Sequence, residues 1–401
     1  MYEIGEEEVE AVARVIRRKK LFRYGGKEPT ECELLEREWA AQFGAAHALA
    51  VNSGTSALIV ALIGAGIEPG DEVILPGYTF VASAQAILAV GAVPVLAEVD
   101  AGLMLDPKDV QAKLTQRTRA IMPVHMLGHV ADLEPMLKLA NERGVMVIED
   151  ACQCVGGSYR GKRAGTWGKT GAYSLNFYKV LSAGEGGMLV TNDKTAWQRG
   201  RVQHDTGTAW RDDIGQMQIP LFAGENYRFD ELRGAVMRVQ LGRLQSILTR
   251  LRAARKTLAQ RLDGAPGLSF APVHDPEGVT GAALFLRVEN REQALAFHKL
   301  AGERGLSTGL PYDSGRHVYT NWEVLLERRG AYHPARDPLH TTEAGRAQRY
   351  TKDMLPRTLE NLARVVSVGI GLNWSAEEIE KQAEGLRQAA REVQGAPVAS
   401  K

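Results

Sequence analysis

The sequence predicts an α/β protein, with a large domain built on a mostly parallel central sheet and a smaller α+β domain after it. Two patterns support this fold class: short apolar runs alternate with helix-length segments in the first half of the chain, and a long helical pattern follows residue 230. With 401 residues, of which 44% are hydrophobic, the chain can bury a core in each of two domains. We place an N-terminal segment and the large domain in residues 1–250, and the small domain in residues 251–401.

The strands predicted for the central sheet are short apolar runs bounded by polar residues or glycine. They cover residues 47–51, 72–76, 93–97, 119–124, 144–149, 171–175 and 187–191. Helices are predicted between them, at residues 56–66 and 132–143 among others. This alternation is typical of a parallel sheet with helices packed against it.

The second half of the chain has a different pattern. Apolar residues recur at near-helical spacing among arginines from Leu232 to Leu251, which predicts a long helix leaving the large domain. A strand at residues 284–288, a helix at 291–304 and a final helix at 376–393 complete the predicted small domain.

Composition and charge exclude several kinds of partner. The 49 basic and 48 acidic residues give a formal net charge of +1 and are spread along the chain, so we expect neither a nucleic-acid nor a membrane partner. No apolar run reaches the roughly 20 residues that span a bilayer. The first residues are acidic where a signal peptide would be basic, and we therefore expect a cytoplasmic protein.

The three cysteines predict neither a disulfide framework nor a metal site. An odd number of cysteines suits a reducing compartment. Cys152 and Cys154 form a C-x-C pair, and no cluster of Cys or His at metal-ligand spacing lies near them in the sequence. We predict no bound metal.

A candidate anion site follows the first strand. Asn52-Ser-Gly-Thr-Ser-Ala-Leu58 opens a helix, so the amides after Gly54 and the hydroxyl of Thr55 would face an anion at the helix N-terminus. The alternative is an ordinary N-cap, because Ser or Thr is also preferred there without any ligand.

Two further residues lie where parallel strands end, at the edge where open α/β sheets place their ligands. Phe80 follows the second strand and could lie flat against an aromatic ring, although a core phenylalanine is the alternative. Asp150 follows the apolar run 145–148, where a carboxylate loses hydration unless a cationic partner meets it. A capping or salt-bridged aspartate is the alternative for Asp150.

Lys179 lies between Tyr178 and a glycine-rich turn at residues 184–187. A solvated lysine is the alternative for this position alone, but the order of anion site, aromatic ring, acid and amine favours one shared function. Pyridoxal phosphate needs a carboxylate to keep its ring nitrogen protonated and a lysine to form a Schiff base and move protons. Asp150 and Lys179 can fill these two roles.

With these motifs the chain resembles the DegT-type sugar aminotransferases, within the aspartate-aminotransferase fold type of pyridoxal-phosphate enzymes. The resemblance covers nearly the whole chain. Its motifs are Tyr24-Gly25-Gly26, Ser53-Gly54-Thr55, Pro76-Gly-Tyr-Thr-Phe80, Glu149-Asp-Ala-Cys-Gln153, the segment from Ser174 to Lys179, Gly184-Glu-Gly-Gly187 and Gly224-Glu-Asn-Tyr-Arg228. One departure is Leu175 after Ser174, where the family usually has phenylalanine.

The resemblance implies a role for each matching residue. It implies Lys179 as the Schiff-base lysine, Asp150 on the pyridine nitrogen, Gln153 near the ring hydroxyl and Phe80 stacked on the ring. The cofactor phosphate would be held by Gly54, Thr55 and Ser174. Asn226 matches a position that reaches the phosphate of the neighbouring subunit, which implies a homodimer with shared active sites.

The substrate prediction rests on similarity to one branch of the family. Phe22-Arg-Tyr24, Asp275-Pro-Glu-Gly278 and the segment from His317 to Trp322 resemble the branch that aminates 3,8-dideoxyoctulosonate at its terminal position. This similarity implies Arg23, Tyr24 and His317 as substrate residues, with a surface Arg and His as the alternative.

We therefore expect an aminotransferase that moves an amino group from an amino acid such as L-glutamate to a keto-sugar. Aminotransfer to a cyclitol ketone or a nucleotide-linked keto-sugar, a dehydratase, and a non-catalytic sensor with this fold are the alternatives. Lys179 argues against the dehydratases of this family that carry histidine there. A nicotinamide-dependent dehydrogenase is disfavoured because no Gly-x-Gly-x-x-Gly follows the first strand.

Overall fold

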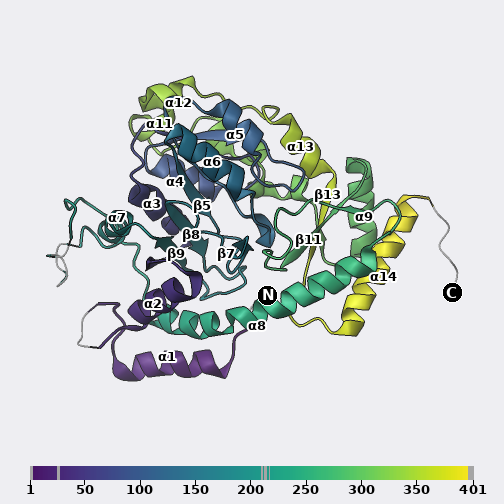
Figure 1. Ribbon diagram of the computed structural model, residues 1–401, viewed down its shortest axis with the longest axis horizontal. Coiled ribbons are helices and arrows are strands. Elements are labelled where there is room, and N and C mark those ends of the chain that lie inside the picture. The colour runs from purple at the N-terminus through teal and green to yellow at the C-terminus, as the bar shows by residue number, and fades with distance from the viewer. Residues whose placement is uncertain (1–2, 25–27, 209–210, 212–214, 216, 396–401) are drawn as a thin grey trace.

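A computed structural model describes residues 3–24, 28–208, 211, 215 and 217–395 of the chain. A large body surrounds a central sheet, and a smaller body with its own sheet lies beside it (Figure 1). The long helix α8 (Glu231–Leu262) runs from beneath the large body to the small one. This arrangement confirms the predicted α/β fold with a mostly parallel central sheet.

The central sheet has seven strands in the order β1-β9-β8-β5-β4-β2-β3. Only β9 runs against its neighbours, so the other six strands point the same way. Their bounds are β1 His47–Val51, β2 Glu72–Pro76, β3 Val93–Ala97, β4 Thr118–Ile121, β5 Met146–Asp150, β8 Thr170–Ser174 and β9 Gly187–Thr191. The carboxyl ends of the six parallel strands therefore meet at one edge, where ligand sites form in sheets of this kind.

The ends of β4 and β5, which lie beside Pro123, differ from the predicted ends. Pro123 has no N–H to give to a ladder, and β4 ends at Ile121 rather than at residue 124. The Pro123 carbonyl still accepts a hydrogen bond from the Asp150 amide, at 3.0 Å. Pairing of Asp150 with Ala172 of β8 carries β5 to Asp150, one residue beyond the predicted end.

Helices cover both faces of the central sheet, and β1 shows how. Leu49 and Val51 belong to the core that includes α3, whereas Ala48 and Ala50 belong to the core that includes α2 and α8. Successive side chains of a strand point to opposite faces, so both faces of β1 are buried. The helices of this body are α1 Glu6–Arg18, α2 Glu31–Phe43, α3 Gly54–Ala65, α4 Ala82–Ala89, α5 Pro107–Lys113, α6 Leu133–Arg143 and α7 Lys194–His204. A short hairpin, β6 Ser158–Tyr159 and β7 Lys162–Arg163, lies between β5 and β8.

The small body has an antiparallel sheet of four strands in the order β10-β11-β13-β12. Its strands are β10 Ser269–Phe270, β11 Ala283–Arg287, β12 Thr308–Gly309 and β13 Val365–Gly369, and its helices are α9 Arg291–Glu303 and α14 Ala376–Val393. The division at residue 250 stays a prediction, and α8 carries the chain across that position without a break.

The segment between β12 and β13 returns to the large body. Val318, Tyr319 and Trp322 are buried in the same core as the central sheet. The α-helices of this segment are α10 Glu323–Leu326, α11 Pro338–Thr341, α12 Glu343–Ala347 and α13 Pro356–Ala363. The segment therefore brings residues of the C-terminal half close to the ends of the central strands.

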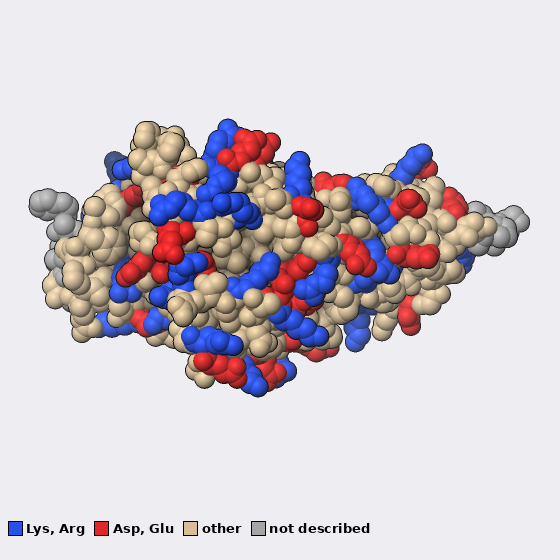
Figure 2. Space-filling view, turned by 90° about the horizontal axis from the view of Figure 1, so that it is seen from above, with Lys and Arg blue, Asp and Glu red and all other residues tan. Residues whose placement is uncertain are grey.

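The surface carries both signs of charge. Figure 2 shows basic and acidic side chains mixed over one face of the molecule, without a broad area of a single sign. Within the described ranges, no helix is long and apolar enough to cross a membrane.

Candidate active site

Several predicted site residues meet at the carboxyl edge of the central sheet. Asp150 ends β5, Ser174 ends β8, and Gly54 begins α3 directly after β1. Phe80 lies in the loop after β2, just before α4. Because these strands are parallel, four segments far apart in the sequence reach one place.

The predicted anion site lies at the start of α3, where Ser53 is the N-cap residue. The Ser53 hydroxyl accepts a hydrogen bond from the Ser56 amide at 3.0 Å. The start of α3 therefore has an ordinary serine N-cap, one residue before Gly54, and the anion site stays a prediction. Thr55 lies inside the first turn, half-buried, and the capping role does not occupy its hydroxyl.

Two glycines allow the backbone to close around this helix end. A Cβ added to Gly54 would lie 2.7 Å from the Cβ of Ser174, so the start of α3 and the end of β8 are in direct contact. A Cβ on Gly187 would lie 2.2 Å from the Ser53 carbonyl oxygen. Any larger residue at either position would push apart the elements that bring Gly54, Thr55 and Ser174 together.

Asp150 is buried, with only 3% of its surface exposed. One carboxylate oxygen accepts a hydrogen bond from the Ser83 hydroxyl at 2.7 Å, and the other accepts one from the Cys152 amide at 3.0 Å. Within the described residues, Asp150 forms no ion pair, so the salt-bridge alternative finds no support there. Ser83 was not predicted as a site residue, although its spacing of four from Thr79 across the start of α4 was a usable signal.

Lys179 lies in a turn after β8 and is half-buried. Its amide donates to the Asn176 carbonyl at 2.9 Å, which closes the turn. Burial raises the pKa of the Cys152 thiol well above its usual range, and the charge of Asp150 adds to this while that of Lys179 opposes it. Asp150 ends β5, and Lys179 comes five residues after the end of β8, the strand paired with β5, so the acid and the amine follow neighbouring strands.

His317 lies beside Phe80. Its ring is 5.4 Å from the ring of Phe80, between centroids, and the Thr79 amide donates to its carbonyl at 3.0 Å. Burial lowers the pKa of His317, the Ser314 carbonyl opposes this, and the Lys179 charge lowers it further. Phe80 is 40% exposed, so the alternative of a core phenylalanine is wrong.

The remaining predicted residues lie around this cluster or apart from it. The Gln153 side chain accepts a long hydrogen bond, 3.4 Å, from the Leu127 amide. Asn226 is exposed, on a segment that runs beside the end of β1, where the Asn52 amide donates to the Tyr227 carbonyl at 2.9 Å. Gly25 and Gly26 of the Tyr24-Gly25-Gly26 motif lie outside the described residues.

Arg23 and Tyr24 make contacts within the chain. Arg23 is only 2% exposed, and its guanidinium donates to the Ala50 carbonyl at 2.9 Å and to Glu36 at 2.6 Å. The Tyr24 hydroxyl shares a hydrogen bond with the His204 ring at 3.2 Å. A substrate role for Arg23 and Tyr24 stays a prediction, and Arg23 stabilises the edge of β1.

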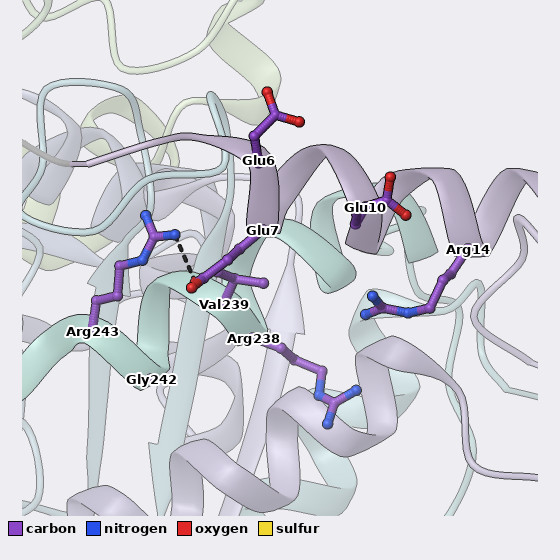
Figure 3. A pocket seen from close by; sticks show the side chains of 8 residues that line it. All are labelled: Glu6, Glu7, Glu10, Arg14, Arg238, Val239, Gly242 and Arg243. Carbon is purple, nitrogen blue, oxygen red and sulfur yellow. Dashed lines mark hydrogen bonds and ion pairs between the residues drawn. The ribbon is translucent and has the colours of Figure 1, made fainter.

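Two surface hollows lie elsewhere in the molecule. One, of about 710 Å³, lies between α1 and α8, with Glu7 bonded to Arg243 at its rim (Figure 3). The other, of about 560 Å³, lies between α8 and the start of α14. None of the predicted site residues lines either hollow.

The cluster at the sheet edge fits pyridoxal phosphate on its own geometry. A buried carboxylate without a charged partner among the described residues suits a protonated ring nitrogen. A half-buried lysine follows the neighbouring strand β8, and the N-terminus of α3 at Gly54 lies directly against Ser174, so a phosphate there would face backbone amides. The described residues contain no group of three or more His, Cys, Asp or Glu that could hold a metal ion.

Comparisons with known proteins identify the family of the chain. Residues 2–332 match the model of the DegT/DnrJ/EryC1/StrS aminotransferase family. The chain is 40% identical to the 3-amino-5-hydroxybenzoate synthase of Amycolatopsis mediterranei, over 78% of this chain and 81% of that protein. It is 34% identical to the dTDP-3-amino-3,4,6-trideoxy-alpha-D-glucose transaminase of Streptomyces venezuelae, over 90% of this chain and 88% of that protein.

A solved structure extends the agreement to the fold. The S. venezuelae protein DesV, crystallised in complex with a ketimine intermediate, superposes with a TM-score of 0.78 at 31% identity, over 96% of this chain and 94% of that chain. The chain therefore belongs to the DegT/DnrJ/EryC1/StrS aminotransferase family and is a pyridoxal-phosphate-dependent aminotransferase.

Proposed function

We propose that this enzyme transfers an amino group from an amino acid, with L-glutamate as the first candidate, to a ketone on a sugar or a related ring. The observation that supports this most is the meeting of Asp150, Lys179 and the Gly54 helix end at one edge of the sheet. We also propose a division of the chain at residue 250, a cytoplasmic location, and the residue roles given below.

Each residue of the cluster has one task in this proposal. When bound, pyridoxal phosphate supplies an electron sink for the carbanion formed at the donor's α carbon. Lys179 holds the cofactor and, once released, takes the proton from that carbon and returns it elsewhere. Asp150 keeps the proton on the ring nitrogen.

The other residues position the cofactor. Gly54, Thr55 and Ser174 bind the phosphate, Phe80 lies against the ring, and Gln153 faces the ring hydroxyl. A phosphate at the N-terminus of α3 is favoured by about 0.3–1 kcal/mol through the helix dipole alone, before any hydrogen bond is counted.

We also propose a homodimer in which Asn226 reaches the phosphate of the neighbouring subunit. The exposure of the Asn226 side chain is compatible with a contact outside its own chain. The Asn226→Ala homodimer should then bind the cofactor weakly. In a mixed dimer with a Lys179→Ala chain, the site that keeps Lys179 receives Asn226 from the other chain and should bind the cofactor normally.

Two acceptors deserve direct comparison. The first is 8-oxo-3,8-dideoxyoctulosonate, which the segments around Arg23 and His317 suggest, with Arg23, Tyr24 and His317 as proposed substrate residues. The second is a cyclitol ketone, favoured by the 36% identity, over 268 residues, to the L-glutamine:2-deoxy-scyllo-inosose aminotransferase of Streptomyces kanamyceticus. Mass spectrometry of the products formed from each ketone with the same amino donor would distinguish them.

The absorbance spectrum of the purified protein with pyridoxal phosphate tests the core of the proposal. We expect a visible band from the lysine-bound cofactor, which shifts toward the pyridoxamine form when L-glutamate is added. Lys179→Ala should lose this band, whereas Lys138→Ala, which changes a lysine that is 77% exposed, should keep it. A band that persists unchanged in Lys179→Ala would overturn the assignment of Lys179.

A further inference from the structure

Asp150 is the end of a chain of buried hydroxyl groups. The Ser83 hydroxyl lies 2.7 Å from one Asp150 oxygen and 2.7 Å from the Thr79 hydroxyl. Ser83 and Thr79 are each 1% exposed, and Asp150 is 3% exposed. The chain Thr79–Ser83–Asp150 is therefore shielded from water along its length.

The direction of the protons in this chain follows from the acceptors. The Ser83 hydroxyl has one proton and three acceptors in reach, the Asp150 carboxylate at 2.7 Å, the Thr79 hydroxyl at 2.7 Å and the Phe80 carbonyl at 3.2 Å. A carboxylate is the strongest acceptor of the three. With the Ser83 proton donated to Asp150, the Thr79 hydroxyl donates to the Ser83 oxygen and reinforces this orientation.

Asp150 has few other ways to stabilise a negative charge. Its second oxygen accepts the Cys152 amide at 3.0 Å, and the described part of the chain offers it no ion pair. A carboxylate oxygen has about two acceptor sites, so both oxygens retain capacity for a further donor. Hydrogen bonds from neutral donors favour the charged form of a carboxylate without neutralising it.

We propose that Ser83, oriented by Thr79, is a positioning residue for the transamination: its hydroxyl stabilises the negative charge of Asp150, so that the proton shared with the cofactor's ring nitrogen stays on the nitrogen. The inference rests on the proposed role of Asp150. Its consequence is chemical, because the protonated ring is the stronger electron sink. Without the Ser83 hydroxyl, the carboxylate holds the shared proton more tightly and the ring nitrogen holds it less.

Nitrogen NMR of the holoenzyme, loaded with pyridoxal phosphate labelled with ¹⁵N in the ring, tests this directly. We expect the wild-type signal at the position of a protonated ring nitrogen. In Ser83→Ala the signal should move toward the unprotonated position, and turnover should fall roughly tenfold or more, as for a lost hydrogen bond to a charged group. Thr79→Val should move the signal the same way by a smaller amount. Ser83→Thr keeps the hydroxyl, so its signal should stay at the wild-type position.

A matched control comes from another buried hydroxyl. Thr358 is fully buried and donates to the buried carboxylate of Glu98 at 2.6 Å, away from Asp150. Thr358→Val should leave the ¹⁵N signal unchanged, even though it also removes a hydrogen bond to a buried carboxylate. A merely structural role for Ser83 would reduce the amount of folded enzyme without moving the signal.

Asp150→Asn separates the inference from the proposal beneath it. If Asp150→Asn leaves the signal at the wild-type position, the proposed role of Asp150 fails. If Asp150→Asn moves the signal while Ser83→Ala and Thr79→Val both leave it in place, only the role of Ser83 is overturned. Should Ser83→Ala not fold, Thr79→Val and Ser83→Thr still decide the question.

Discussion

Glu149 and Asp150 are consecutive carboxylates at the end of β5, yet their surroundings are opposite. Glu149 is fully buried and accepts hydrogen bonds from the amides of Gly165, Trp167 and Gly168 at 2.6–2.8 Å, with the His125 ring at 3.2 Å. Asp150 accepts one hydroxyl and one amide. We call the surroundings of Glu149 the closed side of β5 and those of Asp150 the open side.

The difference separates a carboxylate that stabilises the fold from one that is available to a ligand. On the closed side, the acceptor capacity of Glu149 is used by the chain itself, and the loop at residues 163–168 is held in place. On the open side, acceptor capacity remains. In the proposed function, the ring nitrogen of the cofactor would be the further partner that the buried charge of Asp150 lacks.

The sharpest test of the open side is Asp150→Asn. We expect turnover to fall roughly 100-fold to 1,000-fold, the cost of removing one electrostatic contact to the reacting system. The free energy of unfolding without cofactor should change little, because Asn can still accept the Cys152 amide. Steady-state kinetics and urea denaturation of the same preparation would check both; a large loss of stability in the apoenzyme would contradict the distinction between the two sides.

On the closed side, Glu149→Gln should have the reverse effect. The amide of Gln presents N–H groups to backbone N–H donors, which leaves buried donors unsatisfied and should cost about 3 kcal/mol in the free energy of unfolding. Turnover per folded, cofactor-loaded molecule should stay within a few-fold of wild type. Loss of turnover with unchanged stability would show that Glu149 also belongs to the reaction.

The position of Asp150 at the sheet edge could be predicted from the sequence, whereas the partners of Glu149 could not, for a physical reason. Asp150 ends an apolar strand and Lys179 lies five residues after the end of its neighbour, and the parallel order of the two strands brings these ends to one edge. The partners of Glu149 are backbone amides of a loop some 16 to 19 residues away, whose conformation no local pattern specifies. Their contact with β5 appears only in the folded chain.

Contacts formed only in the folded chain also explain why Arg23 is buried. From sequence it was a candidate for the substrate, but folding places Arg23 beside Glu36, and together they bind both polar groups of Ala50 on β1. The small sheet was predicted only in part, since β10 and β12 have two residues each, too few for a pattern of alternation. Strands as well defined as β2 and β3 were predicted to the residue.

Gly54→Ala tests whether the open side also depends on close backbone approach. The added methyl would lie 2.7 Å from the Ser174 Cβ, so α3 and β8 must separate. We expect the affinity for pyridoxal phosphate to fall about tenfold to 100-fold, which corresponds to about 1.4–2.7 kcal/mol. Cofactor titration followed by absorbance measures this, with Gly242→Ala on α8 as the control because nothing lies within 4 Å of its added Cβ. An unchanged affinity in Gly54→Ala would remove the Gly54–Ser174 contact from the phosphate site.

The smallest expected effect concerns a buried histidine four residues after His125. His129 is 3% exposed, its ring stacks on Phe285 with 4.4 Å between centroids, and burial lowers its pKa to about 3. Between pH 6.5, the ordinary value, and pH 3, the unfolded chain binds a proton at His129 that the folded chain does not. The stability that His129 contributes as a neutral ring is therefore complete above pH 6.5 and is lost as the pH falls toward 3.

The pH dependence of a variant isolates this contribution. Going from pH 7.5 to pH 5.5, wild type should lose about 1.4 kcal/mol more free energy of unfolding than His129→Gln, because one pH unit below 6.5 corresponds to one unit of proton linkage. Urea denaturation at the two pH values gives the difference, with the wild-type value at pH 7.5 as the reference. Equal losses in both proteins would mean that His129 accepts a proton in the folded state, which would contradict the lowering of its pKa by burial.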